Sequence, residues 1–494
     1  MEYSGFLNLQ PLDYKKAQIL FAAYCILAPI FGFIIRKSPL FKRITFLAMC
    51  VMITSGIWHH QEWGLTVHPI LYRGHSRGFH FFWVEVAAVA LIFAHMFGNW
   101  KRFRFFPPGF WLYIVYCSAC LLSIINAPEK LFALFAAFKA FKFVLVFVAA
   151  YNFIRTEEDL RFALISLGVV IFWQLIAVLN QKYVQGIYQV FGTFEHQNSL
   201  SMFTILIGMV FLSVAMGPKR PSSIYFVFAF IASGVIVQST LSRAGLFIFA
   251  FGTMLVIMAS LMDKATRRRL TILAGITVIG FIGLAMTIDT IMKRFTDYGT
   301  QESKITRDHL NIASRKMLYE YPLGIGWNNF ALTINPPYSY GDHIDEYHRQ
   351  AGNTVDKDYR KGVVESLWFL HLAETGYQGL ITYLVIIAVF LFWNVQNIIY
   401  YRRRYLGAVS IGLLVGSLMN YGQSFLERVL TQPRNAMLWL ILLAITARIT
   451  VWRKSERRRR TREWRERIER IPAERQLAMK NESHENEAKE PVSA

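Results

Sequence analysis

Four groups of polar residues interrupt an otherwise apolar sequence, and their types suit the handling of a phosphorylated substrate. The first is residues 192–198 (GTFEHQN), and the second is the dipeptide Ser242-Arg243. The third, residues 307–330, begins with an arginine and ends in a Pro/Gly-rich turn, and the fourth begins at Glu365. An arginine guanidinium matches phosphate oxygens, and a carboxylate can accept a hydroxyl proton. These residue types indicate recognition of a phosphate or pyrophosphate next to a general base.

Three of the groups also have ordinary structural explanations. Asn198 or Ser199 could cap a helix, because their side chains accept hydrogen bonds from backbone N–H groups. Arg243, in a tight hairpin between two apolar runs, could reach lipid headgroups. Glu365 could stabilise the positive end of a helix. Arg307 is different. It lies near the start of a predicted helix that ends at Tyr321, before Pro322, and the helix dipole does not favour a cation there, so an anionic partner explains it better.

The elements that must position these residues are membrane helices. The chain has 494 residues, of which 54% are apolar and 17% charged, and its mean hydropathy is +0.33. A soluble protein carries about a quarter charged residues, so a single soluble domain is excluded. Apolar runs near the length of a membrane span predict an all-α, polytopic integral membrane protein with about 13 transmembrane helices. The runs are 17–35, 44–58, 82–98, 109–126, 131–153, 160–179, 199–216, 223–240, 244–262, 270–289, 365–398, 405–421 and 434–452, and Gly376 and Gly379 predict a break in the longest.

The distribution of Lys and Arg predicts the orientation. Alternate loops are basic, and cytoplasmic loops collect basic residues, so the N-terminus is expected outside and the C-terminus in the cytoplasm. The expected parts are a short outer N-terminus (1–16), N-terminal helices (17–180), a core (181–452) with a partly ordered outer loop (290–364), and a basic cytoplasmic tail (453–494). The formal charge of +21 is explained by topology and lipid attraction, and nucleic acid is not an expected partner.

Two lysines lie inside the span predicted over 131–153. Lys139 and Lys142 are three residues apart and so share one helix face. Ionisable groups at this depth are usually functional or paired. Two interpretations remain open: they face a cavity and reach a lipid-linked phosphate, or they pair with Glu85 of another span.

A histidine-rich segment, 59–80, also has several interpretations. Its five histidines are His59, His60, His68, His75 and His80. They could bind a metal, contact headgroups or sugars, or belong to an ordinary loop. Their spacing matches no defensible ligand set, so no metal site is predicted.

In their order along the chain, the four groups resemble the motifs of the O-antigen ligase family, which is related to O-antigen and capsule polymerases. The family pattern is GTF-x-[HN]-x-N, then S-R, then R…M…P-x-G-x-G-x-x-x-F, then H-N-x-x-L-x-x-x-x-E-x-G-x-x-G. The matching residues are Gly192, Thr193, Phe194, Asn198, Ser242, Arg243, Arg307, Met317, Pro322, Gly324, Gly326, Phe330, Glu374, Gly376 and Gly379. The resemblance covers roughly residues 190–420.

The resemblance implies metal-independent glycosyl transfer, without a cofactor, at the outer face of the bacterial inner membrane. The donor would be a glycan on undecaprenyl pyrophosphate, and the acceptor a hydroxyl of a lipid or glycan. Arg243 and Arg307 would engage the pyrophosphate. The other candidates for substrate binding are Thr193, His196, Asn198, Ser242, Gly324, Gly326, His371, Lys139 and Lys142.

One departure concerns the general base. Where the family carries the His-Asn pair, this chain has Glu365-Ser366. Glu365 could replace the histidine, and this is the favoured interpretation; Glu365→Gln is then expected to abolish transfer in a folded protein. A nearby histidine is the second possibility: His371, His309, His343 or His348. The third is a polymerase, or a transferase for another acceptor. A transport or lipid-handling protein without transferase chemistry is the alternative from another class.

Overall fold

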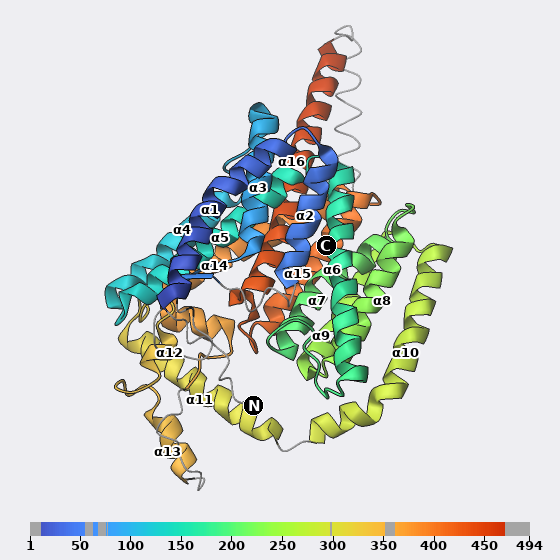
Figure 1. Cartoon of the computed structure of the whole chain (residues 1–494). Helices are drawn as coiled ribbons and strands as arrows, with labels where there is room; N and C mark the ends of the chain where they lie inside the picture. The colour runs from blue at the N-terminus through green and yellow to red at the C-terminus, as the bar shows by residue number, and fades with distance from the viewer. Residues whose placement is uncertain are drawn as a thin grey trace. The chain divides into compact units, whose positions relative to one another are not determined.

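The apolar runs of the sequence form long helices (Figure 1). The computed structural model describes residues 11–54, 63–67, 76, 78–296, 299–350 and 361–469. The helices that coincide with the apolar runs are α1 (Pro11–Ile35), α2 (Pro39–Thr54), α3 (Trp83–Gly98), α4 (Phe110–Leu122), α5 (Lys130–Phe153), α6 (Glu157–Leu179), α7 (Gln197–Met216), α8 (Ser223–Ser239), α9 (Arg243–Asp263), α10 (Arg267–Thr296), α14 (Leu367–Tyr400), α15 (Tyr405–Gln423) and α16 (Pro433–Glu469). Every predicted run therefore overlaps a helix.

Eight of the described helices are long and apolar enough to cross a membrane: α1, α5, α6 with its π-helical extension to Val184, α7, α9, α14, α15 and α16. Three shorter apolar helices lie at α3, at α4 with the turn after it, and at α8. The chain is thus a helical membrane protein, and the count of thirteen spans stays a prediction. A short antiparallel pair, β1 (Trp63–Val67) and β2 (Gly78–Phe81), lies in a segment where no strand was expected.

Helix α7 is the centre of the bundle. It is apolar on all sides and buried along its whole candidate span, where it packs against α8, α9 and α15. A helix that is hydrophobic all round is stable only when other helices surround it. Because α7 is fixed in this way, its first turn can hold polar side chains at a defined place.

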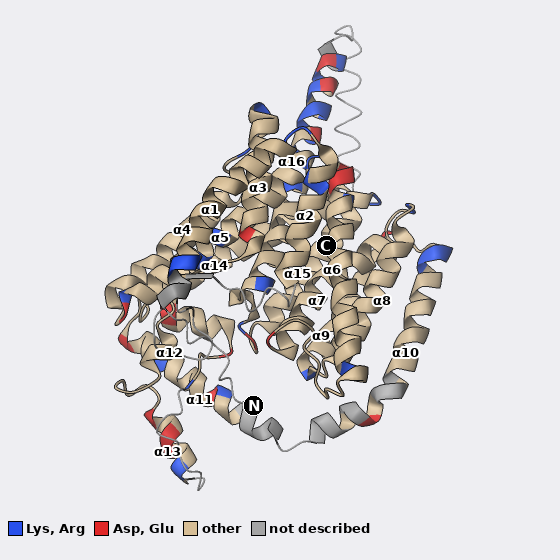
Figure 2. Cartoon of the chain, viewed as in Figure 1, with Lys and Arg blue, Asp and Glu red and all other residues tan. Residues whose placement is uncertain are grey.

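Most charged residues lie near helix ends and connections (Figure 2). At one end the loops predicted to be cytoplasmic contact each other. Their ion pairs are Arg43–Asp159 (3.7 Å), Arg220–Glu157 (2.9 Å) and Arg402–Asp263 (3.3 Å), and the Arg220 guanidinium lies 4.5 Å from the Tyr405 ring centroid. The basic loops thus share one end of the bundle, as predicted. That this end faces the cytoplasm stays a prediction.

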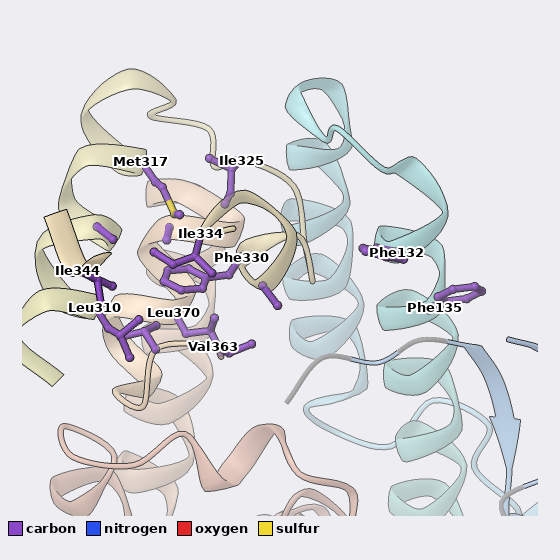
Figure 3. Packing of buried hydrophobic residues seen from close by; sticks show 14 residues of the cluster. Phe132, Phe135, Leu310, Met317, Ile325, Phe330, Ile334, Ile344, Val363 and Leu370 are labelled. Carbon is purple, nitrogen blue, oxygen red and sulfur yellow. The ribbon is translucent and has the colours of Figure 1, made fainter. Parts of the chain in front are cut away.

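The segment before α14 contains further helices: α11 (Gly299–Glu320), α12 (Phe330–Thr333) and α13 (Asp342–Gln350). The predicted helix end before Pro322 is confirmed. Fourteen buried side chains, contributed mainly by α5, α11, α12 and α14, form one apolar cluster, in which Met317, Ile325, Phe330 and Ile334 gather between α11 and α14 (Figure 3). Burial of this apolar surface fixes the segment on the helices beside it.

The predicted break in α14 is present at Gly376, whose φ of 64° and ψ of −166° are non-helical, whereas Gly379 lies within the helix. The backbone of Gly376 lies against Pro322 and Leu323, and a Cβ there would overlap the Pro322 carbonyl oxygen. The backbone N–H of Tyr377 donates to that carbonyl at 3.2 Å. The break therefore holds the Pro/Gly-rich turn against α14.

Gly376→Ala is expected to destabilise the protein by more than about 1 kcal/mol, because alanine tolerates neither the positive φ nor the contact with Pro322. The midpoint of thermal unfolding of the detergent-purified protein measures this. Gly280→Ala in α10 is the matched control, since no atom lies within 4 Å of its Cβ position. Alanine there is expected to be neutral or to stabilise by up to about 1 kcal/mol. Equal midpoints for the two variants would contradict the packing role of Gly376.

A second compact unit begins at Arg448. Its described part, to Glu469, is the end of α16 and carries ion pairs such as Arg460–Glu456 (2.8 Å) and Arg462–Glu466 (2.9 Å) along the helix. The basic tail predicted from residue 453 is therefore helical as far as residue 469.

Candidate functional site

Arg307 is the centre of a polar cluster drawn from four distant segments. Its Nε donates to the Glu365 carboxylate, and its Nη2 lies 3.1 Å from Glu427 Oε1. The same Glu427 oxygen accepts a hydrogen bond from the side-chain amide of Asn198, in the first turn of α7. Three residues predicted from separate motifs therefore meet at one place, around a carboxylate that was not predicted.

Glu427 is the functional candidate that sequence reasoning missed. Its side chain is 13% exposed, against 40% for Glu365. Burial and the neighbouring Glu365 carboxylate raise its pKa to about 7, although Arg307, Asn198 and Arg428 act in the opposite direction. It is the sole acidic residue of segment 422–433, which connects the predicted spans 405–421 and 434–452. This was the sequence signal that could have identified Glu427.

The two carboxylates are brought together by the backbone. The N–H of Leu367, the first residue of α14, donates to the carbonyl of Ser424 at 3.0 Å. This bond joins the start of α14 to the turn that follows α15. Glu365 and Glu427, one on each side of this junction, can then share one arginine.

A partly open cavity of about 100 Å³ adjoins the cluster. Leu367 and Arg428, which lie next to the cluster residues in sequence, are part of its wall. The wall is largely aromatic, and three charged side chains line it. Its aromatic and charged members are Tyr113, Tyr116, Phe143, Trp327, His371, Tyr383, Trp439, Lys139, Glu374 and Arg428. Fixed charges beside aromatic and aliphatic side chains, where fewer waters surround them, act more strongly than they would in bulk water.

Hydrogen bonds hold the charged groups of the wall. Glu374, 7% exposed, accepts a hydrogen bond from the backbone N–H of Phe330 at 3.2 Å. Lys139 Nζ donates to Ser76 Oγ at 3.1 Å, and the Asn328 side chain accepts from the N–H of Ser76 at 2.9 Å. The cavity therefore joins α5, α14 and the glycine-containing turn before α12.

The two lysines of α5 have different surroundings. Lys139 lines the cavity, in agreement with the first interpretation of its role. The pairing with Glu85 is confirmed for Lys142, whose Nζ lies 3.1 Å from Glu85 Oε1, and Lys139 is not the lysine in this pair. The side chains of Lys142 and Glu85 are 6% and 1% exposed. Lys142 is not part of the cavity wall, and its contact with a substrate stays a prediction.

Residues 192–198 form a packed turn before α7. The Thr193 hydroxyl donates to the Thr54 carbonyl, the Gln174 amide donates to that hydroxyl at 2.9 Å, and Arg434 donates to the Thr193 carbonyl. The N-cap of α7 is His196, whose Nδ1 accepts from the N–H of Asn198 at 3.3 Å. The expectation that Asn198 or Ser199 is the cap was wrong, because the Asn198 side chain contacts Glu427 instead.

The Ser242-Arg243 pair opens α9 at the end where α7 starts. Ser242 Oγ accepts from the Gly245 N–H at 3.2 Å and so caps the helix. Gly245 packs against Ser201, one turn into α7. Arg243 is half-buried and does not line the cavity.

The predicted glycines provide close packing. Gly324 and Gly326 have φ of 87° and 106°. A Cβ at Gly324 would overlap the Glu374 carbonyl, and one at Gly326 would overlap Ala127. Gly324 therefore places the turn against Glu374 of the cavity wall, and Gly326 places it against Ala127; direct contact of either glycine with a substrate stays a prediction.

The alternative histidine bases lie in different places. His371 is part of the cavity wall, with its ring centroid 4.7 Å from that of Tyr383. His309 and His343 lie in α11 and α13 with ring centroids 5.3 Å apart, and burial lowers the pKa of His309. Neither they nor His348 line the cavity.

The histidines of segment 59–80 are mostly outside the described residues; His80, in β2, is described, and His59, His60, His68 and His75 are not. Among the described residues, no group of three or more His, Cys, Asp or Glu side chains could hold a metal ion. Metal independence stays a prediction.

No protein-family model matches this sequence, and no match is found among curated proteins. The resemblance to O-antigen ligases therefore depends on the motifs. Two motif residues, Asn198 and Arg307, lie in one cluster with Glu365, which stands where the family carries histidine. A third motif residue, Glu374, lies in the wall of the adjoining cavity.

Proposed function

We propose that this protein is a membrane glycosyltransferase, similar to O-antigen ligases, which transfers a glycan from undecaprenyl pyrophosphate to an acceptor hydroxyl. The reaction would take place at the periplasmic face of the bacterial inner membrane. The observation that carries the proposal is the cluster of Arg307, Glu365 and Glu427 next to an aromatic, charged cavity. The contacts between basic loops at the other end of the bundle support the orientation.

In the proposed reaction, the acceptor hydroxyl attacks the anomeric carbon of the donor glycan. The hydroxyl proton passes to a carboxylate, and the new bond forms between the acceptor oxygen and the anomeric carbon. The bond from that carbon to the pyrophosphate breaks, and its electron pair leaves with undecaprenyl pyrophosphate. Fixed cations lower the barrier by stabilising the charge that develops on the leaving group.

Glu427 is the carboxylate best suited to accept the proton. A general base works best when its pKa is near the working pH, and the pKa of Glu427 is raised to about 7. Arg307 and Asn198 fix the position of its Oε1 atom. Glu365, which is more exposed and bound to Arg307, then acts as a positioning residue.

The surface glycan of cells that lack the protein tests the proposal and separates ligase from polymerase. A ligase predicts long polymer accumulating on the lipid carrier and none on the acceptor. A polymerase, which uses the same donor, predicts an acceptor with a single repeat unit. An unchanged glycan, together with no transfer by the purified protein, would contradict both.

Arg243→Ala is expected to abolish transfer while the protein still inserts normally. The resemblance implies that Arg243 engages the pyrophosphate, and its place at the start of α9 puts it at the end of the bundle that holds Asn198. Transfer by purified protein, with membrane abundance as the control, measures this. Full transfer by the variant would contradict the role of Arg243, whereas loss of transfer with normal insertion favours a transferase over a transport or lipid-handling protein.

A further inference from the structure

The charges at the site divide it into two halves. In the cluster, one cation, Arg307, faces two carboxylates, Glu365 and Glu427. In the cavity, two cations, Lys139 and Arg428, accompany one carboxylate, Glu374. The cavity wall is therefore net positive whether or not Glu374 is ionised, whereas the cluster has no net positive charge even if one carboxylate is protonated.

We propose that the cavity between Lys139 and Arg428 is the binding site for an anionic group of the substrate, a phosphate or a carboxylate. That this anionic group belongs to a substrate of glycan transfer rests on the proposed function. It differs from what the resemblance implies for Arg307, because that guanidinium already contacts two carboxylates. It adds an anion site to the one expected at Arg243.

The size of the cavity limits what enters it. A cavity of about 100 Å³ is smaller than the roughly 150 Å³ of a protein cavity that holds one benzene molecule. Such a space holds a phosphate or carboxylate group, and a whole oligosaccharide does not fit. The bulk of the glycan must then lie outside, on the side of the cluster.

The positions of the two cations suit the binding of an anion. Lys139 is directed by Ser76, which accepts one of its three ammonium hydrogens. Arg428 directly follows Glu427, so the chain presents a base to the cluster and a guanidinium to the cavity at consecutive positions. Aromatic rings form much of the remaining wall and strengthen each charge–charge interaction, because fewer waters surround the charges.

Binding to the full-length protein in lipid nanodiscs tests the inference. The probes are undecaprenyl pyrophosphate without glycan, which presents phosphate, and a glucuronate oligosaccharide, which presents carboxylate. The variants are Lys139→Met and Arg428→Gln. Charge-assisted hydrogen bonds are among the stronger ones, so each variant is expected to weaken binding of one probe by about 10- to 100-fold. Loss with the pyrophosphate probe identifies the donor headgroup as the occupant, and loss with the glucuronate identifies an acidic sugar.

Three further variants distinguish the loss of an anion-binding residue from misfolding or from binding elsewhere. Lys182→Met, which removes a cation outside the cavity wall that donates to the Tyr188 carbonyl, is expected to bind as the unaltered protein does. Lys139→Arg keeps the charge and is expected to recover most of the affinity. Arg307→Gln, a change within the cluster, tests whether the anion binds there instead.

The result that overturns the inference is wild-type affinity in both Lys139→Met and Arg428→Gln, or binding of neither probe. If Arg307→Gln alone greatly weakened binding of a probe, the anion site would be the cluster and not the cavity. The proposed function can be wrong while this inference holds. That would be the result if the purified protein binds an anion through these residues but transfers no glycan.

Discussion

Glu427→Gln is expected to slow glycan transfer by about 10²- to 10⁴-fold, the usual contribution of a positioned general base. Glutamine keeps the size and the oxygen that accepts from Asn198 and Arg307, so the cluster can remain assembled. It cannot accept a proton from the acceptor hydroxyl. Transfer by purified protein with a lipid-linked donor measures the loss, and membrane abundance shows that the variant is made.

The dependence of transfer on pH gives a second readout for the same residue. With its pKa raised to about 7, Glu427 gains its charge as the pH rises through 7, and transfer is expected to rise with it. In Glu427→Gln, the rise of transfer with pH around pH 7 should be absent.

Stability is expected to change in the opposite direction. An ordinary glutamate pKa is 4.5, so between about pH 4.5 and 7 the folded state binds more protons at this site than the unfolded state. The contribution of Glu427 to stability is therefore complete below pH 4.5 and falls as the pH rises through 7. Unfolding midpoints at pH 5 and pH 8 should differ less in Glu427→Gln than in the unaltered protein.

Glu365→Gln distinguishes the two carboxylates. The Glu365 charge is one cause of the raised pKa of Glu427, so its removal is expected to shift the rising limb of transfer to lower pH. Transfer should persist on the plateau above that limb. If Glu365→Gln abolishes transfer and Glu427→Gln does not, Glu365 is the base, as the comparison with the family motif predicts from the sequence.

Hydropathy predicted the helices because burial of apolar side chains depends on local composition. The break at Gly376 was also predictable, since only glycine readily adopts its φ of 64°. Glu427 was not predicted, because the one local signal, a single acidic residue in segment 422–433, does not by itself mark a site. Its importance arises from Asn198 and Arg307, which are 229 and 120 residues away.

The partner of Glu85 shows a different limit of sequence reasoning. Lys139 and Lys142 lie on the same face of one helix, so spacing alone cannot tell which of them meets Glu85. The rotation of α5 against α3 decides this, and it depends on the packing of the whole bundle. In the structure Lys142 forms the ion pair with Glu85, and Lys139 lines the cavity.

Lys142→Met is expected to destabilise the protein by about 3–5 kcal/mol, the usual cost of removing one partner from a buried ion pair. Glu85 is 1% exposed and would be left as a buried charge without its cation. The Lys142 ammonium also lies 4.5 Å from the Phe82 ring centroid, and this attraction would be lost. Unfolding in denaturant of the detergent-purified protein measures the change.

The double variant Glu85→Gln with Lys142→Met shows whether the loss comes from the unpaired charge. A neutral glutamine needs no cation, and its amide oxygen can still accept from the Phe82 N–H, which lies 2.7 Å from Glu85 Oε2. The double variant is therefore expected to be more stable than Lys142→Met alone, because replacing both members of a buried pair costs less than breaking it. Lys139→Met, three residues away in the cavity wall, should leave stability nearly unchanged. A double variant no more stable than Lys142→Met would mean that the lysine contributes through packing, and the ion pair would then have no separate role in holding α3 against α5.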